Sequence, residues 1–122
     1  MSREKLLFVY GTLKRGGSNH HFLNGQKFVA DARTAPGFRL YALDGFPGLV
    51  AQPDDRAGVT GEVWSVTSAA LVHLDALEGL DAGLYRREPI PLLAPFAAQR
   101  VEAYLYARSI AGRRALGATW MG

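Results

Sequence analysis

The apolar runs of this 122-residue chain are short, and turn-forming residues separate them. The first run, Leu6–Tyr10, stops at Gly11, and the pair Pro36-Gly37 interrupts the chain further on. Short apolar runs that end at glycine or proline are typical of β-strands. The chain is therefore expected to fold around a sheet of short strands.

We expect about six such strands, from seven candidate segments. The candidate segments are residues 5–10, 27–32, 39–43, 49–52, 59–66, 85–93 and 101–107. Within the fifth of these segments, Val59, Gly61 and Val63 alternate with Glu62 and Trp64, so the strand should present two different faces. Residues 18–24 are expected to form one or two helical turns.

One segment has the spacing of a longer helix. Leu71, Leu74 and Leu77 recur every three residues, which places them on one helical face. The hydroxyl residue at position 67 or 68 is suited to cap the start of this helix, and Gly79 is placed to end it. The sequence therefore predicts one main helix between two strands.

Together these patterns predict an α+β fold: a small, mixed and strongly curved β-sheet, or a partly closed β-barrel, with one main helix. The length fits a single domain that spans residues 1–122. We expect the core to lie at about residues 5–108. Residues 109–122 are rich in glycine and arginine and are expected to form a loosely held C-terminal tail.

Composition excludes several kinds of site. The chain has no cysteine, so disulfides, thiolate nucleophiles and cysteine-bound metals are ruled out. His20 and His21 are adjacent and would point about 100° apart on a helix, so we expect no metal site. The formal net charge is +3, and most basic residues are scattered along the chain. This charge favours small anionic ligands over nucleic acid.

The longest apolar runs are too short to cross a bilayer, and no signal-peptide pattern follows the first residues. We therefore expect a cytoplasmic protein without a membrane partner. The sequence leaves the oligomeric state open.

The turn after the first strand is a candidate binding site. A strand that stops at Gly11 directs its next backbone N–H groups outward, and such groups suit a carboxylate or a phosphate. We expect Gly11 to permit a positive φ and the close approach of a ligand, while Thr12 adds a hydroxyl. Two other interpretations remain: an ordinary tight turn, and a phosphate-binding loop, although Gly17 occupies the position of the lysine that such a loop requires.

Glu78 is the candidate acid–base residue. It follows Leu71 by seven residues and Leu74 by four, so it shares their apolar helix face. Burial and the negative end of the helix should both raise its pKa, as a base near neutral pH requires. The alternative is that the last turn frays and leaves Glu78 in solvent, paired with Arg86 or Arg87. We expect Asp75 to be a surface residue or a cap partner.

These features occur together in a recognisable order. Val9–Gly16 is followed by Asn19, Gly61–Trp64, Leu74–Gly79 and then Tyr85–Arg87. This arrangement resembles the γ-glutamylcyclotransferase-like family, which includes the γ-glutamylamine cyclotransferases and the AIG2-like proteins. The resemblance extends from about Leu6 to Tyr106 and leaves the C-terminal tail outside it.

The resemblance implies a small mixed β-barrel flanked by helices and a cofactor-independent enzyme. The implied reaction cyclises the γ-glutamyl group of a small molecule to 5-oxoproline and releases the attached amine. By matching position, Glu78 is implied as the general acid–base. Tyr10, Gly11, Thr12 and Leu13 are implied to hold the glutamyl part, and Tyr85 to line the pocket. The alternatives are a non-catalytic module that binds a small carboxylate in the same pocket, and a nucleotide-binding protein.

Overall fold

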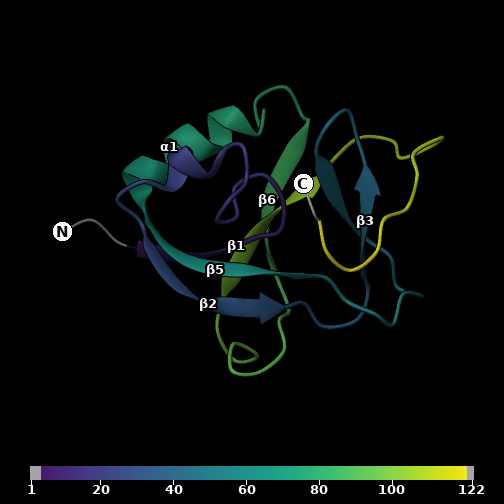
Figure 1. Ribbon diagram of the computed structural model, residues 1–122, viewed down its shortest axis with the longest axis horizontal. Coiled ribbons are helices and arrows are strands. Elements are labelled where there is room, and N and C mark those ends of the chain that lie inside the picture. The colour runs from purple at the N-terminus through teal and green to yellow at the C-terminus, as the bar shows by residue number, and fades with distance from the viewer. Residues whose placement is uncertain (1–3, 121–122) are drawn as a thin grey trace.

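The computed structural model describes residues 4–120, which form seven strands, one short 3-10 helix (η1) and one α-helix (Figure 1). In chain order the elements are β1 (Glu4–Val9), η1 (His20–Leu23), β2 (Lys27–Arg33), β3 (Phe38–Ala42), β4 (Pro47–Ala51), β5 (Thr60–Thr67), α1 (Ser68–Leu77), β6 (Tyr85–Ile90) and β7 (Val101–Tyr106).

The strands form one mixed sheet in the order β2-β5-β1-β7-β4-β3, and β6 pairs with β7 outside this path. The sheet is open, and the predicted α+β class with one main helix is confirmed. Strand β7 has two parallel neighbours at different points along its length: Phe8 of β1 pairs with Ala103, and Leu49 of β4 pairs with Leu105. Strand β1 therefore lies beside the first half of β7, and β4 lies beside its end.

Strand β1, near the middle of the sheet, is buried on both faces. Phe8 belongs to an apolar layer with β3, β4 and the end of the chain, whereas Leu7 and Val9 belong to a second layer that α1 covers. Residues of β5 alternate in the same way, since Val63 enters the first layer and Trp64 the second. A strand with two apolar faces must be covered on both sides. Here α1 covers one face, and β3 and β4 with the C-terminal segment cover the other.

Helix α1 begins and ends where the sequence predicts. The side chain of Thr67 accepts a hydrogen bond of 3.1 Å from the N–H of Ala70 and so caps the first turn. Gly79, with a φ of 64°, follows the last turn and takes the left-handed conformation that glycine accepts without strain. None of the helices in residues 4–120 is long and apolar enough to span a membrane.

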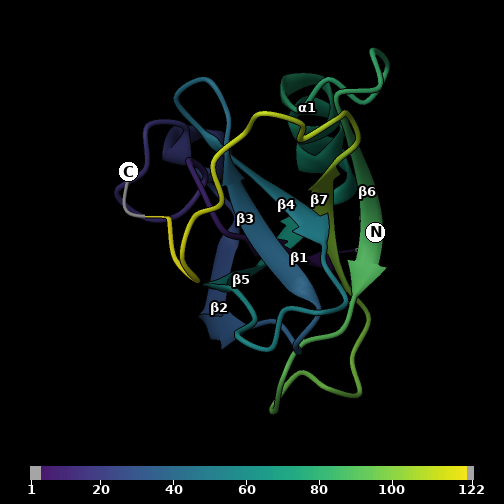
Figure 2. The ribbon, with the colours of Figure 1, turned by 90° about the vertical axis from the view of Figure 1, so that its right-hand side faces the viewer.

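The C-terminal segment, here residues 109–120, is not loosely held, in contrast to the expectation from its composition; residues 121 and 122 of the predicted tail lie outside the described residues. The N–H of Leu116 donates to Leu40 O at 2.8 Å, and that of Ala42 donates to Arg114 O at 2.8 Å. Leu116 and Trp120 also pack against the first apolar layer. As Figure 2 shows, this segment runs beside β3. It supplies partners for main-chain groups that the end strand β3 would otherwise leave unpaired.

Candidate active site

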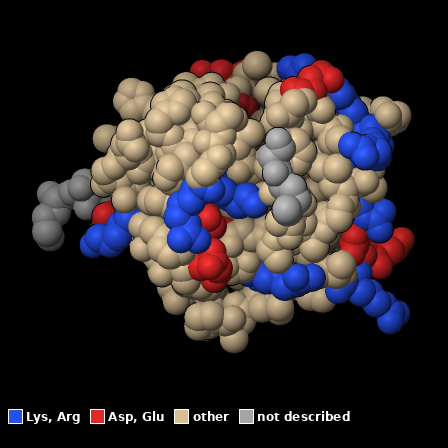
Figure 3. Space-filling view, in the orientation of Figure 1, with Lys and Arg blue, Asp and Glu red and all other residues tan. Residues whose placement is uncertain are grey.

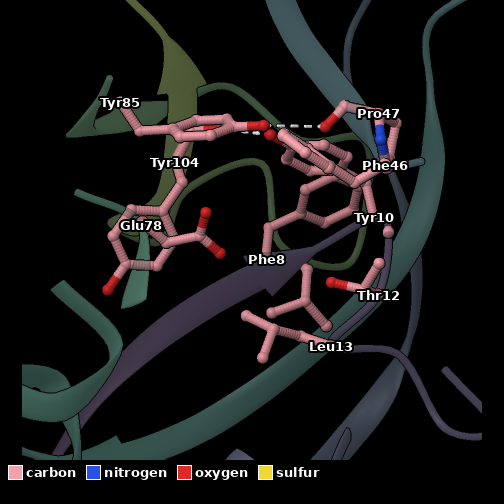
Figure 4. Close-up of a pocket in the computed structure, with 11 residues that line it drawn as sticks. Phe8, Tyr10, Thr12, Leu13, Phe46, Pro47, Glu78, Tyr85 and Tyr104 are labelled. Carbon is pink, nitrogen blue, oxygen red and sulfur yellow. Dashed lines mark hydrogen bonds between the residues drawn. The ribbon is translucent and has the colours of Figure 1, made fainter. Parts of the chain in front are cut away.

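A pocket lies where β1 ends and β4 begins, beside β7. It has about 350 Å³ of empty space, counted out to its mouth and including open solvent. Its walls come from the end of β1, the turn after it, the start of β4, the end of α1, and β6 and β7. The lining residues are Phe8, Val9, Tyr10, Gly11, Thr12, Leu13, Phe46, Pro47, Glu78, Tyr85 and Tyr104 (Figure 4). All six residues proposed from the sequence therefore line one pocket.

The turn at residues 10–13 leaves main-chain donors free. The N–H of Lys14 donates to Gly11 O at 3.0 Å and closes the turn. Asn19 then fixes Thr12, because its N–H donates to Thr12 O at 2.9 Å and its side-chain amide donates to Thr12 Oγ1 at 3.1 Å. Within residues 4–120, no hydrogen bond uses the N–H of Thr12 or of Leu13. Consecutive free N–H groups of this kind suit an anionic oxygen.

Gly11 has a different role from the one expected. It does not adopt a positive φ, so conformational freedom is not the reason for glycine at this position. A Cβ placed on Gly11 would lie 2.6 Å from Pro47 Cγ and 2.9 Å from Pro47 Cδ, which is closer than two carbon atoms can approach. Glycine is therefore required for the close contact between the turn and the start of β4.

The hydroxyl groups of Tyr10 and Tyr85 hold the walls of the pocket together. Tyr10 donates to Tyr104 O at 2.6 Å and accepts from the N–H of Leu49 at 3.3 Å, which links β7 to β4. Tyr85 donates to Pro47 O at 2.9 Å, which links β6 to the start of β4. Both hydroxyl protons are thus committed to main-chain oxygens, and the two side chains offer the pocket their aromatic rings.

Glu78 is the acidic residue of this pocket. It caps the C-terminal end of α1, where its N–H donates to Leu74 O at 2.9 Å, and its carboxyl group points into the pocket (Figure 4). Burial raises the pKa of Glu78 from 4.5 to about 7. The predicted rise is confirmed, and burial is its cause.

The alternative of a frayed, solvent-exposed Glu78 is wrong. The candidate partners have other acids: Arg86 pairs with Glu88, and Arg87 pairs with Glu102 and with Asp75. Within the part of the chain that the structure describes, no hydrogen bond or ion pair involves the carboxyl group of Glu78. It is therefore free to exchange a proton with a molecule in the pocket.

Sequence reasoning missed the contact between Asp75 and the pocket wall. Tyr104 donates its hydroxyl proton to Asp75 Oδ1 at 2.7 Å, and Asp75 also lies 3.2 Å from Arg87 Nε. The expectation of a surface or capping role for Asp75 is wrong, because its side chain is only 27% exposed. A signal was present, since Asp75 precedes Glu78 by three residues and so lies near it on the helix.

Phe46 and Pro47 were also missed as pocket residues. In the sequence they stand in a stretch that indicates only a turn, and nothing in it shows that this turn lies against Gly11. No group of three or more histidine or acidic side chains within residues 4–120 is placed to hold a metal ion.

Comparison with known proteins gives a consistent result. The family model described as gamma-glutamyl cyclotransferase, AIG2-like, matches residues 7–121. The match includes the C-terminal segment, which the resemblance drawn from sequence motifs left out.

Three relatives illustrate the range of similarity. The chain is 36% identical over 111 residues to gamma-glutamylaminecyclotransferase A of Danio rerio, covering 84% of this chain and 68% of the relative. It is 31% identical over 106 residues to the gamma-glutamylcyclotransferase family protein YtfP of Escherichia coli K12, covering 87% of this chain and 86% of the relative. The crystal structure of c4763, described as a uropathogenic E. coli-specific protein, aligns with a TM-score of 0.77 and 27% identity over 95% of this chain and 91% of that one.

Proposed function

The chain belongs to the gamma-glutamyl cyclotransferase, AIG2-like family, and on this basis we propose that it converts a γ-glutamyl amine or peptide into 5-oxoproline and the free amine. The observation that carries the proposal is the pocket itself. Its lining includes a largely buried carboxyl group with a pKa of about 7, together with Thr12 and Leu13, whose main-chain N–H groups make no hydrogen bond within residues 4–120. A base near neutral pH and donors for an oxyanion are the two things that this reaction requires.

The reaction is a ring closure within one molecule. The α-amino nitrogen of the glutamyl group attacks its own γ-carbonyl carbon, so no second reactant has to be brought in. We assign the proton transfers to Glu78. Its carboxylate takes a proton from the attacking nitrogen, and its carboxyl form then gives that proton to the departing nitrogen as the original C–N bond breaks. The atoms balance, because one γ-glutamyl amide yields one 5-oxoproline and one amine.

The turn at residues 10–13 supplies the second part of the proposed chemistry. When the nitrogen attacks, the carbonyl oxygen becomes an oxyanion, and a preorganised N–H group stabilises it without reorganisation. The N–H groups of Thr12 and Leu13 are the donors that we assign either to this oxygen or to the α-carboxylate of the glutamyl group. The rings of Tyr10 and Tyr85 exclude water from the aliphatic part of the substrate.

Glu78 also favours an enzyme over a module that only binds a small carboxylate. A binding pocket for an anion gains nothing from a second carboxyl group, and above pH 7 the two negative charges would repel. The binding-only alternative predicts that pyroglutamate or glutamate derivatives raise the melting temperature while no γ-glutamyl compound is consumed.

The test is a panel of γ-glutamyl amines, amino acids and peptides, with 5-oxoproline measured by mass spectrometry. We expect turnover of at least one compound and a loss of about 100-fold or more in kcat for Glu78→Gln, as is usual when a general acid–base is removed. In the wild type, kcat/KM should rise with pH through about 7, because the carboxylate is the active form.

Glu88→Gln is the matched control, since Glu88 lies on β6 with a half-exposed side chain outside the pocket. Unchanged activity in Glu78→Gln would refute the assigned mechanism. Failure of the whole panel, with binding intact, would favour the binding-only alternative.

A further inference from the structure

His20 is a side chain that the proposed reaction does not use, although its ring contacts the turn at residues 10–13. It is the first residue of η1 and does not line the pocket. Its Nδ1 lies 2.9 Å from Leu13 O. A carbonyl oxygen has no proton to give, so Nδ1 carries the hydrogen and donates it to this oxygen.

This hydrogen bond is the first of a chain that ends at the pocket. Leu13 O and the N–H of Lys14 belong to one peptide unit, and that N–H donates to Gly11 O at 3.0 Å. Gly11 O and the N–H of Thr12 belong to a second peptide unit. Thr12 lines the pocket, and no hydrogen bond in residues 4–120 uses its N–H. His20 is therefore joined to a proposed oxyanion donor through two peptide units.

Such a chain has two effects on its last N–H group. A trans peptide unit is planar, and its C=O and N–H point in opposite directions, so a hydrogen bond to the oxygen also restricts the direction of the N–H. Each hydrogen bond in a chain polarises the next, which strengthens the final donor. The Thr12 N–H is thereby oriented and strengthened before a substrate binds.

Neighbouring groups restrict the ring of His20. Its centre lies 5.3 Å from that of the Trp64 ring, and the two rings meet edge-on at 62°. Trp64 is buried, and its Nε1 donates to Glu62 Oε1 at 3.1 Å. The main-chain N–H of His20 also donates to Gly17 O at 3.2 Å. These contacts limit the orientations of the ring, so that Nδ1 stays opposite Leu13 O.

The loop between Leu13 and His20 is also anchored. Glu62 accepts from the main-chain N–H of Arg15 at 3.1 Å and from its Nε at 2.9 Å. Arg15 Nη2 donates to Asp31 Oδ1 at 2.9 Å. The face drawn in Figure 3 has basic and acidic side chains side by side near its centre. An anchored loop keeps the His20 ring at a constant place relative to the turn.

We propose that His20 is a positioning residue of the active site, which sets the direction and the donor strength of the Thr12 N–H through the turn. The inference rests on the proposed function, in which this N–H serves the oxyanion or the α-carboxylate of the glutamyl group. Because His20 does not line the pocket, it acts on the rate only through the turn.

Two substitutions of His20 test the proposal. His20→Phe keeps an aromatic ring beside Trp64 and removes the donor. His20→Asn keeps a side-chain N–H that is as many bonds from the main chain as Nδ1. With a γ-glutamyl compound that the wild type turns over, we expect kcat/KM to fall about five- to tenfold in His20→Phe, as the loss of one hydrogen bond implies. His20→Asn should restore most of this loss.

His21→Phe is the matched control. His21 is the exposed neighbour of His20, and its ring makes no hydrogen bond within residues 4–120. The variant should keep the kcat/KM of the wild type. A loss of rate in His20→Asn as large as that in His20→Phe would refute the proposal, because the donor would then not be the property that matters.

Amide hydrogen exchange at Lys14 examines the chain without any turnover. Its N–H is the middle donor, and we expect it to exchange about tenfold faster in His20→Phe, but at nearly the wild-type rate in His20→Asn and His21→Phe. If exchange changes in this way and no γ-glutamyl compound is turned over, the hydrogen-bond chain stands and the proposed function fails. If compounds are turned over and His20→Phe retains the wild-type kcat/KM, the function stands and the positioning role is refuted.

Discussion

Glu78 illustrates at the residue scale how a functional group can oppose folding. The carboxyl group is buried, and no charged partner or hydrogen bond in residues 4–120 compensates for its removal from water. Its raised pKa expresses this cost, because the folded protein holds the proton more tightly than the unfolded chain does. The same property suits the group to act as a base near neutral pH, so its proposed catalytic use and its effect on stability have one origin.

The effect on stability has a definite sign. The pKa of Glu78 is about 7 in the folded protein, against 4.5 for an unperturbed glutamate side chain, so the wild type loses stability as pH rises from 4.5 through about 7. Glu78→Gln removes the charge, and we expect it to stabilise the protein at pH 8 by as much as about 3 kcal/mol, with little difference near pH 4.5. Urea unfolding of both proteins at several pH values measures this directly.

Glu88→Gln again serves as the control and should show no such pH-dependent gain. A Glu78→Gln variant that is less stable than the wild type at pH 8 would show that the carboxyl group has a stabilising partner in solution.

At the scale of elements, the end of α1 is tied to two strands through Asp75. Its carboxylate accepts from the Tyr104 hydroxyl of β7 at 2.7 Å and pairs with Arg87 of β6 at 3.2 Å. Burial and the neighbouring Asp75 raise the pKa of Tyr104, so the hydroxyl stays protonated and donates. Because Asp75 and Glu78 share the last turns of one helix, this contact also helps to fix where Glu78 enters the pocket.

A double-mutant cycle on Asp75→Asn and Tyr104→Phe tests this link. We expect each change to lower the free energy of unfolding by about 1–2 kcal/mol, with a coupling energy of about 1 kcal/mol between them. Tyr41→Phe is a matched control, since it removes a tyrosine hydroxyl that bonds to Gln52 and lies outside the pocket. Strict additivity of the two changes would show that the hydrogen bond contributes nothing to stability.

At the scale of the whole molecule, the C-terminal segment completes the fold. The segment pairs with β3, and the N–H of Thr60 on β5 donates to Ala118 O at 2.8 Å. The segment therefore joins β3 to β5, two strands that are not neighbours in the sheet. Trp120 packs against the core and, with Thr119, lines a hollow next to Gly11 and Thr12. The segment therefore reaches from the outer edge of the sheet to the turn that lines the pocket.

Amide hydrogen exchange tests whether this segment is held in solution. The N–H groups of Leu116 and Ala42 have main-chain acceptors, whereas no hydrogen bond in residues 4–120 uses the N–H of Gly117. We expect Leu116 and Ala42 to exchange on the order of 100-fold more slowly than Gly117, once intrinsic rates are allowed for. Equal rates for Leu116 and Gly117 would show that the segment is detached, as its composition alone suggested.

The sequence by itself determined the local structure and the identity of the chemical groups. Short apolar runs predicted the strands, and leucine spacing with flanking Thr67 and Gly79 predicted helix α1, because these patterns depend only on near neighbours. The position of Glu78 on the apolar face of that helix was sufficient to predict the rise of its pKa. Each of these features is set by residues within about one or two helical turns.

Only the tertiary structure decided which distant segments meet. Three contacts show this: Gly11 with Pro47, the hydrogen bond between Tyr104 and Asp75, and the docking of residues 113–120 on β3 and β5. Each joins parts of the chain that are distant in sequence, and a single sequence does not indicate that they meet. Gly11 is the clearest case: the sequence suggested a positive φ and the close approach of a ligand, whereas the fold shows no positive φ and a close contact with Pro47. Long-range packing fixes such contacts because it satisfies main-chain groups and fills space across the whole domain at once.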